Sequence, residues 1–172
     1  MIARHKHTWP NLIWQPSVAI IFVLLVLFVM GHFASGDVLW AVGAGSLSSS
    51  SYIVFGQPSN SSGEPKKIVG GYLVGILTGF ILRILIMQIH NLESSFPGTS
   101  HFYFIGFIAA ISVGICLFFM ALLRLEHPPA AGMALVLVID MHDYNEIVIV
   151  IMAAFLLALI RRFLSKQLID LV

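Results

Sequence analysis

Four long apolar stretches constrain the fold of this chain more than any other feature. They cover residues 16–35, 68–89, 102–123 and 146–163, and a helix of about 20 residues is long enough to cross a hydrocarbon core of roughly 30 Å. Hydrophobic residues make up 59% of the chain and charged residues only 10%, which excludes a soluble domain with a polar surface. Because lipid cannot satisfy backbone polar groups, the sequence predicts an all-α membrane protein.

Two further segments, residues 37–56 and 127–140, lie between these stretches. Both are apolar enough to be membrane-embedded, but glycines and serines interrupt the first, and a His-Pro-Pro sequence opens the second. A helix in lipid is broken only where protein or a water-filled cavity can satisfy the backbone again. We therefore expect about six membrane-embedded segments, four long helices and two interrupted ones, with a solute site at the interruptions.

The distribution of lysine and arginine favours a topology in which both interrupted segments cross the membrane. With six crossings, every Lys and Arg except Arg83 falls on one side, so the positive-inside bias predicts that both termini are cytoplasmic. The chain then forms one domain over residues 1–172. Its N-terminal segment, residues 1–15, and the loop at residues 57–67 are expected on the cytoplasmic side. Each half would have three spans, which is the 3+3 inverted-repeat plan of many transporters. Re-entrant segments are the alternative.

The His-Pro-Pro sequence is typical of a helix start, because proline is well tolerated where a backbone N–H would be unpaired. We expect His127, Pro128, Ala130, Ala131 and Gly132 to bind an anion here, with free N–H groups at the positive end of a helix dipole. The charge change of a histidine near pH ~6.5 would also couple anion uptake to proton movement. The alternative is structural: His127 caps its helix or bonds a neighbouring carbonyl.

A second group of expected binding residues comes from the serine-rich segment: Gly45, Ser46, Ser48 and Ser49. Hydroxyl and backbone N–H groups at close spacing suit a small oxyanion, which several neutral donors can hold without trapping it. The alternative is that these small residues allow tight helix packing, as they commonly do in membranes.

Glycines repeat every fourth residue at Gly71, Gly75 and Gly79. This spacing places them on one helix face, where small residues let two helices approach closely. We therefore expect the stripe to serve packing or dimerisation.

Two arginines are expected to attract anions towards the site. Arg83 is the only Lys or Arg well inside a long apolar stretch rather than at its end, and Arg124 stands beside the His-Pro-Pro sequence. A buried guanidinium is costly in lipid and should face a cavity or a partner. The alternatives are that Arg83 snorkels to the membrane surface and that Arg124 pairs with Glu126.

The second interrupted segment resembles the sequence that gives the HPP family of small integral membrane proteins its name. Arg124 is followed by His-Pro-Pro-Ala-Ala-Gly-Met-Ala-Leu at residues 127–135. The resemblance extends over about residues 37–162 and implies a membrane transporter of a small inorganic anion. Nitrite is one candidate, because family members from plastids and cyanobacteria are associated with nitrite transport.

The serine-rich segment and the residues after it resemble the other segment of this family. The matching residues are Ser46, Phe-Gly at 55–56, Pro58, Pro65 and Ile-Val-Gly-Gly at 68–71. The chain departs from the usual Ser-Phe-Gly-Ala-Ser-like sequence, because residues 44–51 read Ala-Gly-Ser-Leu-Ser-Ser-Ser-Ser. The roles of individual serines therefore do not follow from the resemblance.

An enzyme is not expected, and neither are catalytic residues, a cofactor or a metal. An intramembrane enzyme would need a nucleophile with a base, and the sequence shows no such partner for His127. The acidic cluster at residues 140–146 has no regular metal-ligand spacing. The expected partners are a small inorganic anion, the lipid bilayer and further copies of the chain, without nucleic acid. A bacterial or archaeal inner (plasma) membrane is expected, and a non-transporting assembly or scaffold protein is the main alternative.

Overall fold

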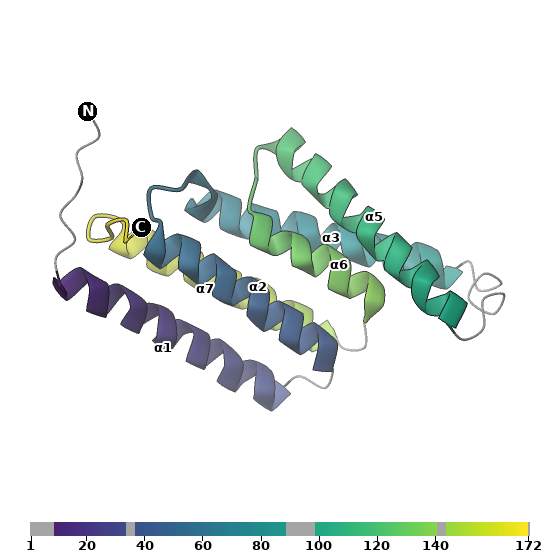
Figure 1. Cartoon of the computed structure of the whole chain (residues 1–172), viewed down its shortest axis with the longest axis horizontal. Coiled ribbons are helices and arrows are strands. Elements are labelled where there is room, and N and C mark those ends of the chain that lie inside the picture. The colour runs from purple at the N-terminus through teal and green to yellow at the C-terminus, as the bar shows by residue number, and fades with distance from the viewer. Residues whose placement is uncertain (1–8, 34–36, 89–98, 141–143, 172) are drawn as a thin grey trace.

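A computed structural model describes residues 9–33, 37–88, 99–140 and 144–171. These residues form α-helices and two short 3-10 helices, which confirms the predicted all-α fold. The elements are α1 (Trp9–Phe33), α2 (Asp37–Gly56), the 3-10 helix η1 (Ser61–Gly63), α3 (Pro65–Gln88), α5 (Thr99–Leu123), the 3-10 helix η2 (Pro128–Ala130), α6 (Ala131–Ile139) and α7 (Tyr144–Leu164). Successive α-helices run in alternating directions through one bundle (Figure 1).

Four helices are long and apolar enough to cross a membrane, as the sequence predicts. The candidate spans are Pro10–Phe33, Pro65–Gln88, Tyr103–Leu123 and Tyr144–Leu164. Large hydrophobic side chains such as Phe28, which is 76% exposed, face outwards from them. Water would penalise such a surface and lipid would not, so these faces are those of an integral membrane protein.

The predicted interruption of residues 37–56 is wrong, because α2 is one continuous helix of 20 residues. The serines do not break it, since each can bond within the helix. The hydroxyls of Ser48, Ser49 and Ser50 donate to the carbonyl oxygens four residues earlier, at 2.8, 3.0 and 3.0 Å. Serine can satisfy its hydroxyl in this way inside a regular helix.

The interruption predicted at the start of residues 127–140 is confirmed. The two prolines form η2, and α6 follows with only 9 residues. At rises of about 2.0 and 1.5 Å per residue, η2 and α6 together are about 20 Å long, which is less than the roughly 30 Å of a hydrocarbon core. The helical part of this segment therefore covers only part of the membrane thickness.

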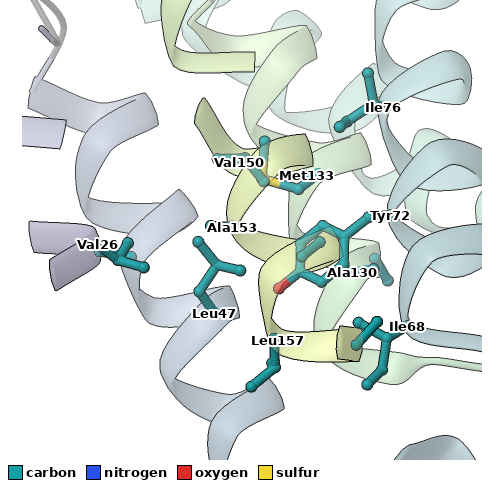
Figure 2. Close-up of a cluster of buried hydrophobic side chains, with 14 of the residues drawn as sticks. Val26, Leu47, Ile68, Tyr72, Ile76, Ala130, Met133, Val150, Ala153 and Leu157 are labelled. Carbon is teal, nitrogen blue, oxygen red and sulfur yellow. The ribbon is translucent and has the colours of Figure 1, made fainter. Parts of the chain in front are cut away.

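The core of the bundle gathers around η2 and α6. Ala130, Met133 and Leu137 are fully buried there. Figure 2 shows side chains of α1, α2, α3 and α7 meeting in a cluster with Ala130 and Met133. The shortest helix is thus enclosed by the longer ones.

The end of α5 explains how the chain reaches the interior. Arg124 has a φ of 56°, the left-handed conformation that usually follows a helix end. Its N–H donates to the carbonyl of Ala121 at 3.2 Å, and the N–H of Leu125 donates to Met120 at 2.8 Å. This pair of bonds is a Schellman motif. It turns the chain sharply, and His127 follows in the interior at 0% exposure.

Basic residues gather at one end of the bundle, as the sequence predicts for one membrane side. Lys66 and Lys67 stand at the start of α3, Arg124 follows α5, and Arg161 and Arg162 lie in the last turn of α7. The start of α1 lies at this same end (Figure 1). Its assignment as the cytoplasmic side and the 3+3 inverted repeat stay predictions.

The C-terminal segment after α7 is tied to this end of the bundle by hydrogen bonds to α1 and α2. The fully buried Gln15 donates to Ile169 O at 2.9 Å and accepts from Ile169 N at 3.2 Å. The N–H of Leu171 donates to Gly56 O at 2.9 Å. Because α1 already begins at Trp9, residues 9–15 belong to the first helix and not to a segment before it.

The glycine stripe of α3 packs against η2 and α6. A Cβ at Gly75 would collide with the carbonyl oxygen of Ala130, and one at Gly79 would lie 2.7 Å from that of Ala134. Glycine is required where backbones approach this closely. The packing alternative is confirmed, and the stripe is used within the chain.

Candidate functional site

His127 connects three parts of the structure. It precedes η2 and is fully buried. Its Nδ1 lies 2.7 Å from the Ser62 carbonyl of η1, and its Nε2 lies 2.7 Å from Ser50 Oγ of α2. Because a carbonyl oxygen only accepts, Nδ1 carries the hydrogen. Of the two structural alternatives, the bond to a neighbouring carbonyl is confirmed, and capping is wrong because the side chain makes no cap hydrogen bond.

Two serines and a tyrosine complete what we call the hydroxyl cluster: Ser46, Ser50, Tyr72 and His127. Tyr72 OH lies 2.8 Å from Ser46 Oγ and 2.9 Å from Ser50 Oγ. Ser46 Oγ also donates to the Pro129 carbonyl at 2.6 Å. All four side chains are buried, and Figure 2 shows Tyr72 reaching from α3 into the hydrophobic core. The bundle thus encloses a connected group of polar side chains.

Simple local features bring these residues together. Ser46 and Ser50 are four positions apart in a continuous helix and share one face of α2. Tyr72 follows Gly71, where a Cβ would lie 2.6 Å from the Cβ of His127. The absence of a side chain at Gly71 therefore lets the histidine pack directly against α3.

The serine-rich segment contributes fewer of its expected binding residues than the sequence predicts. Ser46 joins His127 in the hydroxyl cluster, whereas the hydroxyls of Ser48 and Ser49 bond to their own helix. Ser49 and Gly45 lie on the exposed face of α2, and a Cβ at Gly45 would meet nothing within 4 Å. The structure does not bring Gly45, Ser48 or Ser49 to the cluster.

The N–H groups of Ala130 and Ala131 are not free, so the expectation is wrong for these two residues. The N–H of Ala130 donates to the His127 carbonyl at 3.0 Å, and that of Ala131 donates to the carbonyls of Pro128 and Pro129. A 3-10 turn commonly satisfies the first donors of a helix in this way. An anion at this helix start would have to compete with these internal bonds.

Arg83 is held at the far end of α6. Its Nη1 donates to the Val138 carbonyl in the last turn of that helix at 3.2 Å. A cation there is favoured by the negative end of the helix dipole. Arg83 therefore contacts the opposite end of α6 from His127, and its expected attraction of anions stays a prediction.

Arg124 is exposed at the basic end, and its expected attraction of anions stays a prediction. The alternative that it pairs with Glu126 is wrong. Glu126 instead pairs with Lys67, with 3.3 Å between Oε2 and Nζ. A hydrogen bond from its own backbone N–H, followed by the pairing with Lys67, lowers the pKa of the Glu126 carboxyl. Glu126 is therefore ionised and already paired beside the cluster.

Sequence reasoning missed Ser50 and Tyr72. The spacing of four residues from Ser46 identifies Ser50 once residues 37–56 are treated as a continuous helix. Tyr72 stands in no recognisable motif, and only the packing of α3 reveals it. The expectation that His127 lacks a hydroxyl partner is wrong, because Ser50 lies against it.

Residues 141–143 of the acidic cluster lie outside the described residues. Among the described ones, no three His, Cys, Asp or Glu side chains form a group that could hold a metal ion.

Surface grooves of the bundle are separate from the hydroxyl cluster. One of about 360 Å³ lies between α3 and α5, and one of about 580 Å³ lies between α1 and α7. Both are lined by apolar side chains except for Thr78, and neither includes a cluster residue. These grooves are suited to lipid chains, whereas the polar cluster is closed.

The fold and the hydroxyl cluster define a helical integral membrane protein with a polar site enclosed by its helices. The family model described as HPP, transmembrane region, matches residues 4–168. The chain belongs to the HPP family, as the sequence around the two prolines predicts. Comparison with curated proteins and with solved structures gives no match.

Proposed function

We propose that this protein transports a small inorganic anion across the membrane, with nitrite as the favoured candidate. The observation that carries the proposal is the hydroxyl cluster, which places Ser46, Ser50, Tyr72 and His127 inside an otherwise apolar bundle. Buried polar groups in membrane segments are costly and commonly mark a solute path. Neutral hydroxyl donors can bind an anion and still release it.

A bound anion would replace protein carbonyl groups as the hydrogen-bond acceptor of the serine hydroxyls. Ser46 now donates to the Pro129 carbonyl, and Ser50 lies 3.0 Å from the Ser46 carbonyl. If α2 moves away from η2, the Ser46 hydroxyl loses the Pro129 carbonyl and becomes available to an anion. The Ser50 hydroxyl shares its helix with the Ser46 carbonyl, so it becomes available by rotating away from that carbonyl. The N-terminal end of η2 and α6 adds a favourable dipole. The transporter in this proposal acts as a homo-oligomer, without a cofactor, in a bacterial or archaeal inner membrane.

Replacement of Ser46 by alanine is expected to reduce nitrite uptake about fivefold to tenfold, the effect of losing roughly 1 kcal/mol from one hydrogen bond. Ser49→Ala is the matched control, because that serine lies on the exposed face of the same helix. Uptake is measured with the purified proteins in vesicles, against empty vesicles, after circular dichroism has shown equal helicity. The proposal fails if vesicles with wild-type protein take up no small anion faster than empty ones. Nitrite uptake that falls in Ser49→Ala and not in Ser46→Ala would indicate that the binding site lies on the outer face of α2.

A second candidate function is suggested by the 2.7 Å contact between Ser50 Oγ and His127 Nε2, because a hydroxyl beside an imidazole is the arrangement of an activated nucleophile. Ser50 is however fully buried and also lies within hydrogen-bond distance of the Ser46 carbonyl. No groove described above opens to it, so a substrate could not reach the hydroxyl in this conformation. We therefore favour transport over hydrolysis.

A fluorophosphonate probe is expected to leave the purified protein unlabelled, because the Ser50 hydroxyl is enclosed. Labelling is read by intact-protein mass spectrometry, with Ser50→Ala as the matched variant. Adduct formation on the wild-type protein that disappears in Ser50→Ala would favour a serine hydrolase instead.

A further inference from the structure

The hydrogen bonds of the cluster have directions that the carbonyl groups determine. Nδ1 of His127 must donate to the Ser62 carbonyl, and Ser46 must donate to the Pro129 carbonyl. Ser46 then has no hydrogen left for Tyr72, so Tyr72 donates to Ser46 across their 2.8 Å contact.

Ser50 is left with one hydrogen for three acceptors when His127 is neutral. These are the Ser46 carbonyl at 3.0 Å, Tyr72 OH at 2.9 Å and His127 Nε2 at 2.7 Å. Two short contacts between heavy atoms then lack a hydrogen, and such acceptor pairs repel. With His127 neutral, the cluster therefore has fewer hydrogens than short contacts between donor and acceptor atoms.

A proton on Nε2 supplies a hydrogen to one of these two contacts and so halves the deficit. The imidazolium then donates to Ser50, which keeps its own hydrogen for Tyr72 or for the Ser46 carbonyl. The geometry of the cluster therefore fits the cationic histidine better than the neutral one. Burial opposes that cation, because a charge in a low-dielectric interior is unfavourable without a partner of opposite sign.

Among the described residues, His127 makes no ion pair with a carboxylate. From α3 it meets the neutral phenol of Tyr72, from α2 the hydroxyl of Ser50, and from η1 a backbone carbonyl. On its own connection Glu126 is paired with Lys67, and Arg124 is exposed and positive. An anion bound at the cluster would supply the missing charge.

We propose that the transported anion moves together with a proton, and that His127 Nε2 is the site that carries the proton. This inference rests on the proposed function, and it assigns proton–anion symport to the hydroxyl cluster. Tyr72 is a positioning residue, because its hydroxyl orients the hydroxyls of Ser46 and Ser50. No charge is moved across the membrane in a complete cycle.

The proton balance of the cycle is simple. A proton from the solution on one side binds the lone pair of Nε2 and makes the imidazolium. The anion binds beside it and accepts hydrogen bonds from the N–H and from the serine hydroxyls. When the site opens to the other side, the anion leaves, the Nε2–H bond breaks, and the proton enters that solution.

Vesicles with a trapped pH-sensitive dye test this inference with nitrite as the probe. Nitrite uptake by the wild-type protein is expected to acidify the lumen, above the background of nitrous acid in empty vesicles. An outside pH lower by one unit should raise the limiting nitrite accumulation about tenfold, as the linked proton gradient requires. A membrane potential set with valinomycin and potassium should not change it.

His127→Asn and His127→Gln are the test variants, with His32→Asn on the exposed face of α1 as control. Asparagine can still donate to the Ser62 carbonyl, and glutamine can reach towards Ser50, but neither binds a proton. Both are expected to lose lumen acidification and the response to the pH gradient. Protonation is read directly from the ¹⁵N shift of Nε2 in nanodiscs, assigned by the signal missing in His127→Asn, with and without nitrite.

Nitrite uptake that follows the membrane potential and leaves the lumen pH unchanged would overturn symport and leave anion transport intact. A Nε2 signal that stays neutral in saturating nitrite would also overturn it. Absence of uptake for nitrite and every other small anion would overturn both proposals.

Discussion

Replacing Gly75 with alanine is expected to destabilise the protein by about 3 kcal/mol, the upper end of the range for overpacking a tight interior. The added Cβ would collide with the carbonyl oxygen of Ala130 and lie 3.3 Å from its carbonyl carbon. The obstacle is backbone, which cannot rotate away as a side chain can. α3 and η2 would have to separate, and Tyr72, one turn earlier on α3, would be displaced from its serine partners.

Gly114→Ala is the matched control, because a Cβ at this position in α5 meets nothing within 4 Å. It should be neutral or should stabilise the helix by up to about 1 kcal/mol. Both variants are compared by unfolding in mixed micelles with increasing sodium dodecyl sulfate, followed by circular dichroism. Equal unfolding midpoints for the two variants would contradict the close packing of α3 on η2.

His127→Ala is expected to destabilise the protein by about 3–5 kcal/mol, because it removes a buried side chain and leaves its polar partners unsatisfied. The Ser62 carbonyl would lose its donor and Ser50 would lose a partner in the interior. The connection from α5 would also lose its contact with η1. The same unfolding measurement gives the change in free energy.

His32→Ala removes an exposed imidazole from α1 and should change stability by no more than about 0.5 kcal/mol. If His127→Ala were equally mild, the histidine could not be a fully bonded interior residue. The proposed cluster would then be wrong irrespective of any transport result.

The long helices could be predicted from the sequence because hydrophobic length is a local property. The apolar stretches at 68–89 and 146–163 match α3 and α7 to within a few residues. The first stretch begins earlier than predicted, because α1 continues through Pro16. A proline costs a helix one backbone bond, here the bond that the Leu12 carbonyl would otherwise accept, and the apolar length of α1 tolerates that loss.

The serine-rich segment shows where local reasoning fails. Glycine and serine have low helix propensity in water, so residues 37–56 were expected to be interrupted. In an apolar environment the hydroxyls can bond only to the helix itself or to neighbouring helices, and α2 stays regular. Because α2 is a regular helix, Ser46 and Ser50 lie on its buried face and Ser49 lies on its exposed face. These faces could not be assigned for an irregular segment.

The amino-acid sequence alone identifies a helical membrane protein of the HPP family, with a break at the His-Pro-Pro sequence and with His127 and Ser46 among the candidate residues. These conclusions depend on hydrophobic length, proline chemistry and motif, which are all readable along the chain. The packing of the helices is needed to see that Ser50 and Tyr72 join them and that the amide donors of Ala130 and Ala131 are occupied. Those facts depend on how α2 and α3 pack around η2, and the missing side chains at Gly71 and Gly75 let α3 approach His127 and Ala130 closely.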